Sequence, residues 1–587
     1  MRIAPRFDAA LVSCLILLLT ACGGGGGGGA QSAAIAPVLP PAPPTPTPAA
    51  GAAVTYLQGS ALQSSGTIVA GAHQALIAVM SGDSTASGFA SDALSVSTAG
   101  TSVQIVARAD QAVRTVAPAH VNPVEAFPAD DRALLQRMQS LRTAEAGAPA
   151  RTLQSVLPST LTVGTSAALW VQKGSLSGGR VNVQVPATLL AQSAHANIWI
   201  DDTLQLPQSA LSQIVADTEN AYASDTAHFA SPDYSSSAPG LQPRYSSCAA
   251  GGASQGSAPA YIAEPADHRI DVMVVNSSNL GGLGGYFSAA NLMTQATLNC
   301  LNGSATTYES NEAPFIFVGW FANSGTSYEL KEDLVRSTAH ELQHLINFVN
   351  HGILASGASS NSFNGNETPY INEGLSMLAQ DLAVANMYGA QGVRFDADDA
   401  LARANVYLAA PSNFSLSGFT GLDPVSWGGS STPQYNCGGG CYGAAYLFER
   451  YLRDRFGGDA YTHAMETSGI TGDANLRATT GETPASLFGD FALAMAANSL
   501  HVSSSDPRFA FGTLDLSGSY PDQFGTTTNL GGLFAQPFSG SAVNVSAPVG
   551  GFAFVSMAAV PQSGTAVSVS DHGSAPGFSL EGGLAQK

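Results

Sequence analysis

The chain has 587 residues and a mass of 59.7 kDa, long enough for two to four domains with a large buried core. Hydrophobic residues make up 45% and charged residues only 11%, against a usual ~25%, so small polar residues must supply much of the surface. This composition argues against a disordered chain and is typical of exported proteins. The formal net charge of −20 would repel nucleic-acid phosphates, so we expect no nucleic-acid partner.

The first 21 residues resemble a bacterial lipoprotein signal. Arg2 and Arg6 precede a nine-residue apolar run, and Leu19-Thr20-Ala21-Cys22 then places small residues before a cysteine. The run is far shorter than the ~20 residues that a membrane-spanning helix needs. We expect cleavage before Cys22, a lipid on that cysteine, and a location in the bacterial cell envelope, at the outer membrane, facing the periplasm or on the cell surface. An ordinary secretory signal is the alternative.

Residues 22–52 are predicted to be a tether. Seven consecutive glycines at 23–29 are followed by a Pro/Ala/Thr-rich string at 36–51, which is a flexible segment followed by an extended one. Neither composition can build a core. The tether would hold the folded part away from a membrane, which is therefore one expected partner.

Residues 53–192 are predicted to be an N-terminal β-rich region. Short Val/Ile/Thr-rich runs alternate with Gly, Ser and Asp clusters, as in strands joined by turns, and one stretch has helical periodicity. The expected elements are strands at 65–69, 75–80, 102–107, 161–171 and 181–185 and a helical insert at 129–145.

Residues 193–505 mix strands with long helices and form the predicted central domain. Continuous apolar runs bounded by turn residues indicate buried strands, and apolar residues three and four apart indicate helices packed on one side. The last segment, 506–587, is Gly/Ser-rich and strand-like, and is predicted to be a C-terminal β-module. The expected strands of the central domain are 196–201, 270–275 and 314–320, and its expected helices are 211–222, 328–350, 372–388, 443–456 and 484–498.

The predicted helix at 328–350 contains His340-Glu341-Leu342-Gln343-His344. Histidines four residues apart lie on one face of a helix, so both imidazoles can reach one metal ion at about 2.0–2.1 Å. Glu341 can reach a water molecule at that ion without ligating the ion, which suits a general base. With 11 histidines in 587 residues, chance would supply roughly 0.005 such motifs.

Two histidines do not complete a catalytic zinc site, which takes three protein ligands and leaves one position for water. The next predicted helix opens with Asn372-Glu373-Gly374, and Glu373 is the natural third ligand. The alternative is a first-turn glutamate that is favoured only by the helix dipole.

These helices resemble those of the gluzincin zinc metallopeptidases, and most closely the hyicolysin-type family of secreted bacterial neutral zinc peptidases. The resemblance rests on HELQHLINF at 340–348 and NEGLSMLAQDL at 372–382, with a weaker likeness of YGAAYLF at 442–448. The resemblance covers roughly residues 193–505, where it implies a zincin-type catalytic domain with a mixed sheet and a mostly helical half. With the N-terminal and C-terminal β-rich regions predicted above, which lie largely outside the resemblance, the expected fold class is α+β. The resemblance also implies zinc held by His340, His344 and Glu373, with Glu341 as the base for peptide hydrolysis.

The resemblance extends to a hydrogen-bond donor for the transition state. Related gluzincins carry a Tyr or His roughly 60 to 70 residues after the third ligand, where it stabilises the oxyanion. Tyr442 stands at that spacing after Glu373, and we expect it to fill this role. Tyr446 and His463 are the alternative donors, and an ordinary core aromatic is the alternative interpretation of Tyr442.

Four cysteines would remain in the mature chain beside Cys22, an even number that favours two disulfides in an oxidising compartment. Cys437 and Cys441 bracket three glycines that can close on themselves, so we favour the pairs Cys437–Cys441 and Cys248–Cys300. A cysteine-rich zinc site is the alternative, although CxxC spacing is absent.

The leading hypothesis is a membrane-anchored zinc endopeptidase acting on protein or peptide substrates. One alternative is a surface binding or adhesion lipoprotein that uses a zincin scaffold, and another is an aminopeptidase. Asp396, Asp398 and Asp399 raise calcium as a second metal. However, EF-hand spacing is missing, and a solvated loop or helix N-cap is the simpler interpretation.

Overall fold

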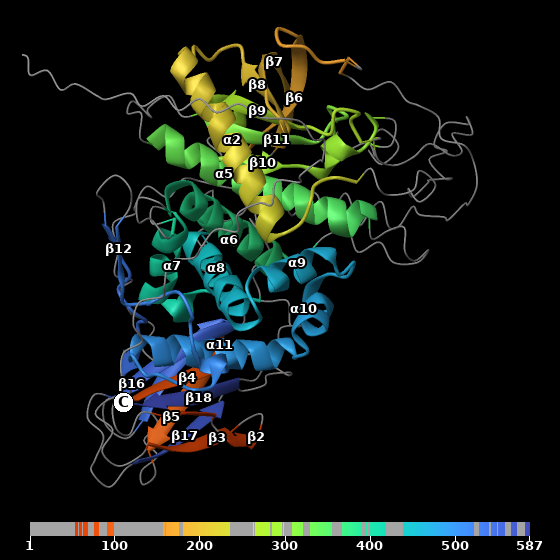
Figure 1. The fold of residues 1–587 in the computed structure, drawn as a ribbon. Helices are drawn as coiled ribbons and strands as arrows, with labels where there is room; N and C mark the ends of the chain where they lie inside the picture. The colour runs from red at the N-terminus through yellow and green to blue at the C-terminus, as the bar shows by residue number, and fades with distance from the viewer. Residues whose placement is uncertain are drawn as a thin grey trace, which may run out of the picture. The chain divides into compact units, whose positions relative to one another are not determined.

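The computed structural model is a mixed α and β protein (Figure 1). Several predicted features lie outside the residues that it describes: the signal and tether with Cys22, the strand at 102–107 and the helix at 129–145. The described residues are 53–56, 58–60, 63–68, 75–81, 91–98, 157–158, 160–174, 180–234, 262, 264–281, 284–295, 298, 308–320, 329–354, 367–389, 395–396, 399–417, 438–521, 527–538, 542–548, 550–557, 565–571 and 581–586.

A six-stranded sheet lies beside the predicted metal-binding helix, in the order β10-β11-β9-β8-β7-β6. Its parallel strands are β8 (Ala196–Asp201), β9 (Ile270–Asn276) and β11 (Phe315–Trp320). The antiparallel strands are β10 (Gly285–Phe287) at one edge and β7 (Arg180–Gln192) and β6 (Ser166–Gly174) at the other.

The parallel strands are apolar along most of their length because both faces of the sheet are covered. On one face, Ile198 and Val272 join the main core, which includes residues of α2 (Gln208–His228) and α5 (Glu329–Phe348). On the other face, Trp199 belongs to a smaller buried cluster. The predicted boundary after residue 192 is wrong in one respect, since β6 and β7 belong to this central sheet.

Helices α6 (Pro369–Tyr388) and α8 (Gly438–Arg455) cross at very short range, and glycine makes this possible. A Cβ on Gly374 would lie 2.6 Å from Cγ of Glu449 and 2.8 Å from the carbonyl oxygen of Ala445.

Among the described residues, no helix is long and apolar enough to cross a membrane. The other longer helices are α7 (Ala400–Ala409), α9 (Asp459–Thr467), α10 (Gly472–Thr480) and α11 (Pro484–Ser499), and a π-helical turn (Val349–Leu354) follows α5.

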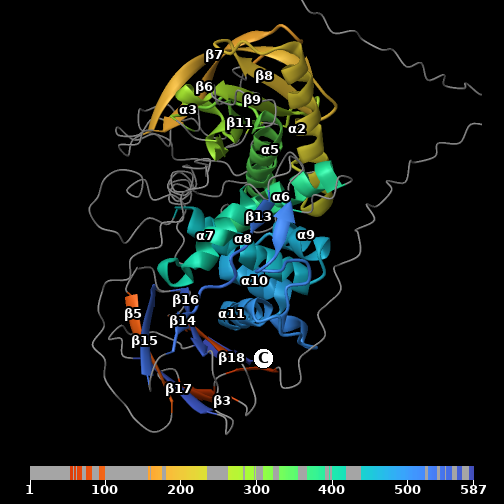
Figure 2. The same ribbon diagram turned by 90° about the vertical axis from the view of Figure 1, so that its left-hand side faces the viewer.

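The two ends of the chain share two five-stranded sheets (Figures 1 and 2). One has the order β1-β18-β4-β16-β14 and the other β15-β5-β17-β3-β2. The strands at 53–98 of the predicted N-terminal region and those at 536–586 of the predicted C-terminal module are therefore interleaved parts of one unit, whereas β6 and β7 belong to the central sheet. Its strands are β1 (Ala53–Tyr56), β2 (Gln58–Ser60), β3 (Gln63–Ile68), β4 (Ala75–Ser81), β5 (Ser91–Thr98), β14 (Gln536–Pro537), β15 (Ala542–Pro548), β16 (Gly551–Met557), β17 (Thr565–Asp571) and β18 (Glu581–Gln586).

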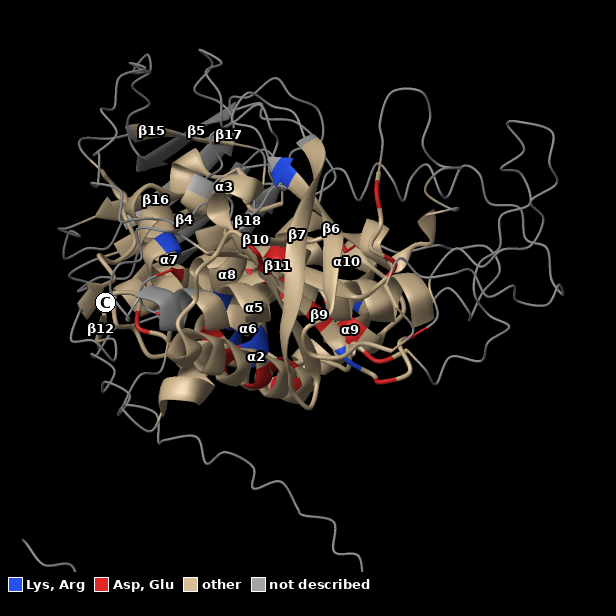
Figure 3. Ribbon diagram, turned by 90° about the horizontal axis from the view of Figure 1, so that it is seen from above, with Lys and Arg blue, Asp and Glu red and all other residues tan. Residues whose placement is uncertain are grey.

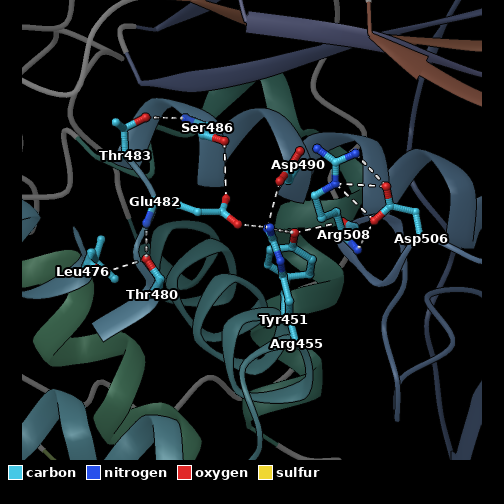
Figure 4. A network of polar contacts seen from close by, with 10 residues as sticks. All are labelled: Tyr451, Arg455, Leu476, Thr480, Glu482, Thr483, Ser486, Asp490, Asp506 and Arg508. Carbon is cyan, nitrogen blue, oxygen red and sulfur yellow. Dashed lines mark hydrogen bonds and ion pairs between the residues drawn. The ribbon is translucent and has the colours of Figure 1, made fainter. Parts of the chain in front are cut away.

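A buried polar network joins α8 to α11, which in turn contacts β4 and β18 (Figure 4). Nη1 of Arg455 donates to Oδ2 of Asp490 and to the hydroxyl of Tyr451, both at 2.8 Å, and Nη2 pairs with Glu482. The guanidinium is buried and hydrogen-bonded on several sides, the condition under which a buried charge is tolerated. Arg455 thus connects α8 to α11, the helix that contacts the shared β-unit.

Basic positions are few in the described part of the chain. Figure 3 shows Lys and Arg as isolated segments of a ribbon that is mostly neither acidic nor basic. This distribution matches the low charged fraction of the sequence.

Candidate metal centre

The predicted metal-binding motif lies on α5, where it is fully packed. His340 is 0% exposed, Glu341 1% and His344 8%. Apolar side chains of the same helix, such as Leu342 and Leu345, are buried in the main core, which holds the histidine face of α5 against α6. The motif is therefore on a rigid element rather than on a solvated loop.

Helix α6 brings Glu373 to the same point. The helix begins at Pro369, so Glu373 lies beyond its first turn and is 0% exposed. A glutamate favoured only by the helix dipole would lie in the first turn and face solvent. The position of Glu373 therefore fits the third-ligand interpretation.

The donor atoms of these three residues have the spacing of ligands around one ion. Oε2 of Glu373 lies 3.4 Å from Nε2 of His340 and 3.5 Å from Nε2 of His344, and all three donor atoms lie within 4.8 Å of one another. Ligands bound at about 2.0–2.1 Å to a tetrahedral ion are about 3.3–3.4 Å apart. Among the described residues, neither carboxylate oxygen of Glu373 has a hydrogen-bond partner. The residues present therefore fit a metal ion.

The protonation states of Glu373 and His344 depend on each other. Burial alone would raise the pKa of Glu373, but the adjacent His344 and His340 lower it to about 2. Burial disfavours the charged form of His344, yet the carboxylates of Glu373 and Glu341 outweigh this effect and raise its pKa to about 9. A proton on His344 thus balances the Glu373 charge, and a metal ion at the same atoms would displace that proton.

Glu341 has the opposite environment. Burial, reinforced by the nearby Glu373 carboxylate, raises the pKa of Glu341 to about 8, although His344 and a hydrogen bond from the backbone N–H of Phe287 act against it. Phe287 ends β10, and a Cβ on Gly285 of the same strand would lie 3.1 Å from Oε1 of Glu341. The edge strand therefore fixes the position of the candidate base.

The far ring nitrogen of His344 is held by α6. Nδ1 of His344 lies 3.1 Å from Oδ1 of Asn372 and 3.0 Å from Oγ of Ser376. A ring nitrogen that donates to such partners leaves the other nitrogen, Nε2, to bind a metal. Sequence reasoning missed both residues, although their positions beside Glu373 on α6 are a usable signal.

Tyr442 is buried on α8, at 2% exposure, and its ring lies under the guanidinium of Arg403, with Cζ 4.9 Å from the ring centroid. The alternative donors are engaged elsewhere. The hydroxyl of Tyr446 donates to Oδ2 of Asp381 at 2.9 Å, and Nδ1 of His463 lies 2.7 Å from the carbonyl oxygen of Phe229. The oxyanion role of Tyr442 stays a prediction.

Of the aspartates considered for calcium, Asp399 lies at a helix N-cap, one of the two expected positions, whereas Asp396 is buried and the solvated-loop interpretation is wrong for it. Both are buried, and Asp398 lies outside the described residues. Nη1 of Arg336 donates to Asp396 at 3.2 Å, and Nε of Arg403 donates to Asp399 at 2.6 Å. Asp399 occupies the N-cap of α7 without making a side-chain cap bond. Arginine cations supply the positive charge that these carboxylates require.

Cys441 is disulfide-bonded. Cys248, Cys300 and Cys437 lie outside the described residues, so the pairs proposed from the sequence stay predictions.

A second group of possible ligands lies on the segments that follow α2 and precede β9. Nδ1 of His268 is 3.3 Å from Glu264 and 3.4 Å from Asp233, and the group is partly exposed. These contacts are those of a surface ion-pair group.

Comparison of the chain with models of known protein families and with curated proteins finds no match. The site therefore has to be interpreted from its own geometry.

Proposed function

We propose that the protein is a zinc-dependent endopeptidase, with His340, His344 and Glu373 as the metal ligands and Glu341 as the general base. The observation that carries this proposal is the buried His340–His344–Glu373 group, whose donor atoms are spaced as ligands of one ion, beside a carboxylate of raised pKa. Two histidines and a carboxylate with an open fourth position form a known catalytic zinc donor set.

The chemistry divides between the ion and the chain. When bound, zinc would act as a Lewis acid that polarises a peptide carbonyl and lowers the pKa of water. Glu341 accepts the proton of the attacking water and returns it to the leaving amine. In the metal-free site a pKa of about 8 keeps Glu341 protonated near neutral pH, and the positive charge of an ion would lower that pKa, so that the carboxylate form is available to accept a proton.

Strand β10 supports a peptide as the substrate. It is the edge strand of the six-stranded sheet, and Phe287 of this strand donates its backbone N–H to Glu341. A sheet edge offers backbone donors and acceptors to an extended chain, which can add as a further strand. A substrate chain added as a strand at this edge would place a peptide bond from its interior, rather than its terminus, next to Glu341. This favours an endopeptidase over an aminopeptidase.

We also propose that Cys22 anchors the protein to a membrane of the bacterial cell envelope, on the basis of the Leu19-Thr20-Ala21-Cys22 sequence and the tether. Labelled palmitate should enter the wild type and not Cys22→Ser. Equal labelling of both proteins would refute the anchor.

The experiment that tests the function combines metal analysis with a casein assay, with and without a chelator. We expect one zinc per chain and hydrolysis that the chelator abolishes. Glu341→Gln should keep zinc and lose activity by orders of magnitude. Glu373→Ala should lower the zinc occupancy, because only two of the three ligands remain. Zinc binding without hydrolysis would favour the adhesion scaffold, and unchanged turnover in Glu341→Gln would refute the mechanism.

A further inference from the structure

A chain of buried polar side chains leads away from the candidate metal centre and has no part in the mechanism above. It starts at His344, passes through Ser376 and Gln343, and ends at Glu466 on α9. Ser376, Gln343 and Glu466 are each 0% exposed. Buried polar side chains are costly unless they are hydrogen-bonded, so a continuous buried chain of this kind requires an explanation.

We propose that Ser376, Gln343 and Glu466 form a positioning relay that holds His344 in the orientation and tautomer that bind the metal. The inference rests on the proposed metal site and deepens it. It assigns these residues no contact with the substrate or with the ion.

The relay begins with the direction of its hydrogen bonds. Nε2 of Gln343 donates to Oε1 of Glu466 at 2.7 Å, which turns Oε1 of Gln343 towards Ser376. The Ser376 hydroxyl has a single proton and two acceptors within reach, that oxygen and, at 2.9 Å, the carbonyl oxygen of Asn372. Oγ of Ser376 is then an acceptor for Nδ1–H of His344 at 3.0 Å. With its proton given to either acceptor, Ser376 is left as an acceptor towards the imidazole of His344.

The acceptor role of Ser376 determines which nitrogen of His344 is free to bind the metal. With its proton on Nδ1, His344 presents the lone pair of Nε2 to the point where Nε2 lies 3.5 Å from Oε2 of Glu373. Oδ1 of Asn372 accepts from the same Nδ1 at 3.1 Å, so both neighbours on α6 favour this tautomer.

His344 is also the ligand that most needs restraint. It is 8% exposed, whereas His340 and Glu373 are completely buried. Glu466 strengthens the restraint because its second oxygen accepts from Nδ2 of Asn347 at 3.1 Å, one turn beyond Gln343 on α5. The Glu466 side chain of α9 thus accepts hydrogen bonds from two successive turns of α5, the helix that carries His340 and His344.

The test compares Gln343→Met and Ser376→Ala with a matched control, Gln380→Met. Gln380 is a glutamine on α6, 1% exposed, whose amide bonds to Asp396 and Asp399 instead of leading to His344. Three quantities are measured: the zinc Kd by competition with a chelator, the visible spectrum of the Co²⁺-loaded protein, and the thermal stability of the metal-free protein.

Loss of a partner behind a metal ligand typically weakens metal binding by about 10- to 100-fold. We expect this loss for Gln343→Met and Ser376→Ala, together with an altered Co²⁺ spectrum, and recovery in Ser376→Thr, which keeps a hydroxyl. The double variant should bind zinc no more weakly than the weaker single variant, because both changes break one chain. Gln380→Met should lower stability and leave the zinc Kd and the spectrum unchanged.

The relay is overturned if Gln343→Met and Ser376→Ala keep the wild-type zinc Kd and spectrum, or if Gln380→Met weakens zinc equally. A wild type that binds no zinc would overturn the proposed function as well. Zinc binding that depends on the relay, in a protein that cleaves no peptide, would support the relay and refute only the peptidase.

Discussion

Glu341 and Glu373 are two buried carboxylates in one site with opposite pKa shifts. Burial raises the pKa of Glu341 to about 8, whereas two adjacent histidines lower that of Glu373 to about 2 despite its burial. Pairs of groups whose environments separate their pKa values in this way mark an assignment of roles. Glu373 stays an anion suited to a cation, and Glu341 can exchange a proton.

At the same scale, Tyr442 is the residue whose chemistry depends on one hydroxyl. Tyr442→Phe keeps the ring under Arg403 and removes only that hydroxyl, so fold and zinc content should not change. If the hydroxyl stabilises the oxyanion, kcat should fall by ~10² to 10³ with little change in KM. A normal kcat in Tyr442→Phe, together with a large loss in Tyr446→Phe or His463→Ala, would move the role to the other residue.

Glu449 makes the stability of the protein depend on pH. The hydroxyl of Tyr461 donates to its Oε2 at 2.9 Å, and its Oε1 has no hydrogen-bond partner among the described residues. Burial, and then repulsion from Glu367 and Glu466, raise the pKa of Glu449 well above its usual range. The folded state therefore keeps a proton that the unfolded chain releases near pH 4.3, and stability falls as the pH rises above that value.

Glu449→Gln removes this titration and retains the acceptor for Tyr461. Its free energy of unfolding should match the wild type near pH 4 and exceed it at pH 8. The difference should grow by up to about 1.4 kcal/mol per pH unit until the folded pKa is reached. Urea unfolding at the two pH values measures this, and a variant that is no more stable than wild type at pH 8 would contradict it.

At the scale of elements, β10 and α5 are coupled through Gly285. A Cβ there would lie 2.8 Å from the carbonyl oxygen of Phe317 and 3.1 Å from Oε1 of Glu341. Gly285→Ala should therefore displace the edge strand and the base, and lower kcat by about 10- to 100-fold while zinc is retained. Gly389→Ala is the control, since a Cβ at Gly389 would meet nothing within 4 Å. Equal activity of the two variants would show that β10 does not position Glu341.

At the scale of the whole molecule, the first and last strands of the chain depend on each other. β4 lies between β18 and β16, and β5 lies between β15 and β17. Removal of residues 53–98 would leave the C-terminal strands without their neighbours and expose their edges. This arrangement suits a permanent part of the fold rather than a removable prosegment.

A protease site inserted between β5 and β6 tests this dependence. After cleavage, the N-terminal fragment should stay bound to the rest of the protein in gel filtration and separate only in denaturant. Fragments that separate in native buffer would show that the shared sheets do not hold the ends together.

Local patterns in the sequence were sufficient for most of the longer helices, for the central strands, and for identifying His340, His344 and Glu373 as residues that lie together. The spacing of His340 and His344 predicts that they share one helix face, because the helical period is a local property. The predicted strand at 196–201 coincides with β8, because an apolar run of that length needs cover on both faces. Glu373 followed from the ligand count that zinc requires.

Only the tertiary structure decided which distant segments meet. Strand pairing depends on contacts between residues far apart in the chain, so the sharing of sheets by residues 53–98 and 536–586 is not encoded in any local pattern. The same holds for Gln343 and Glu466, which are brought together by the packing of α9 against the turn after α5. The burial of Asp396 is a further example, because the arginine that pairs with it, Arg336, lies 60 residues earlier in the chain, on α5. Sequence periodicity determines local shape and the chemistry on each face, but the burial and partners of a polar side chain depend on packing that forms only in the folded chain.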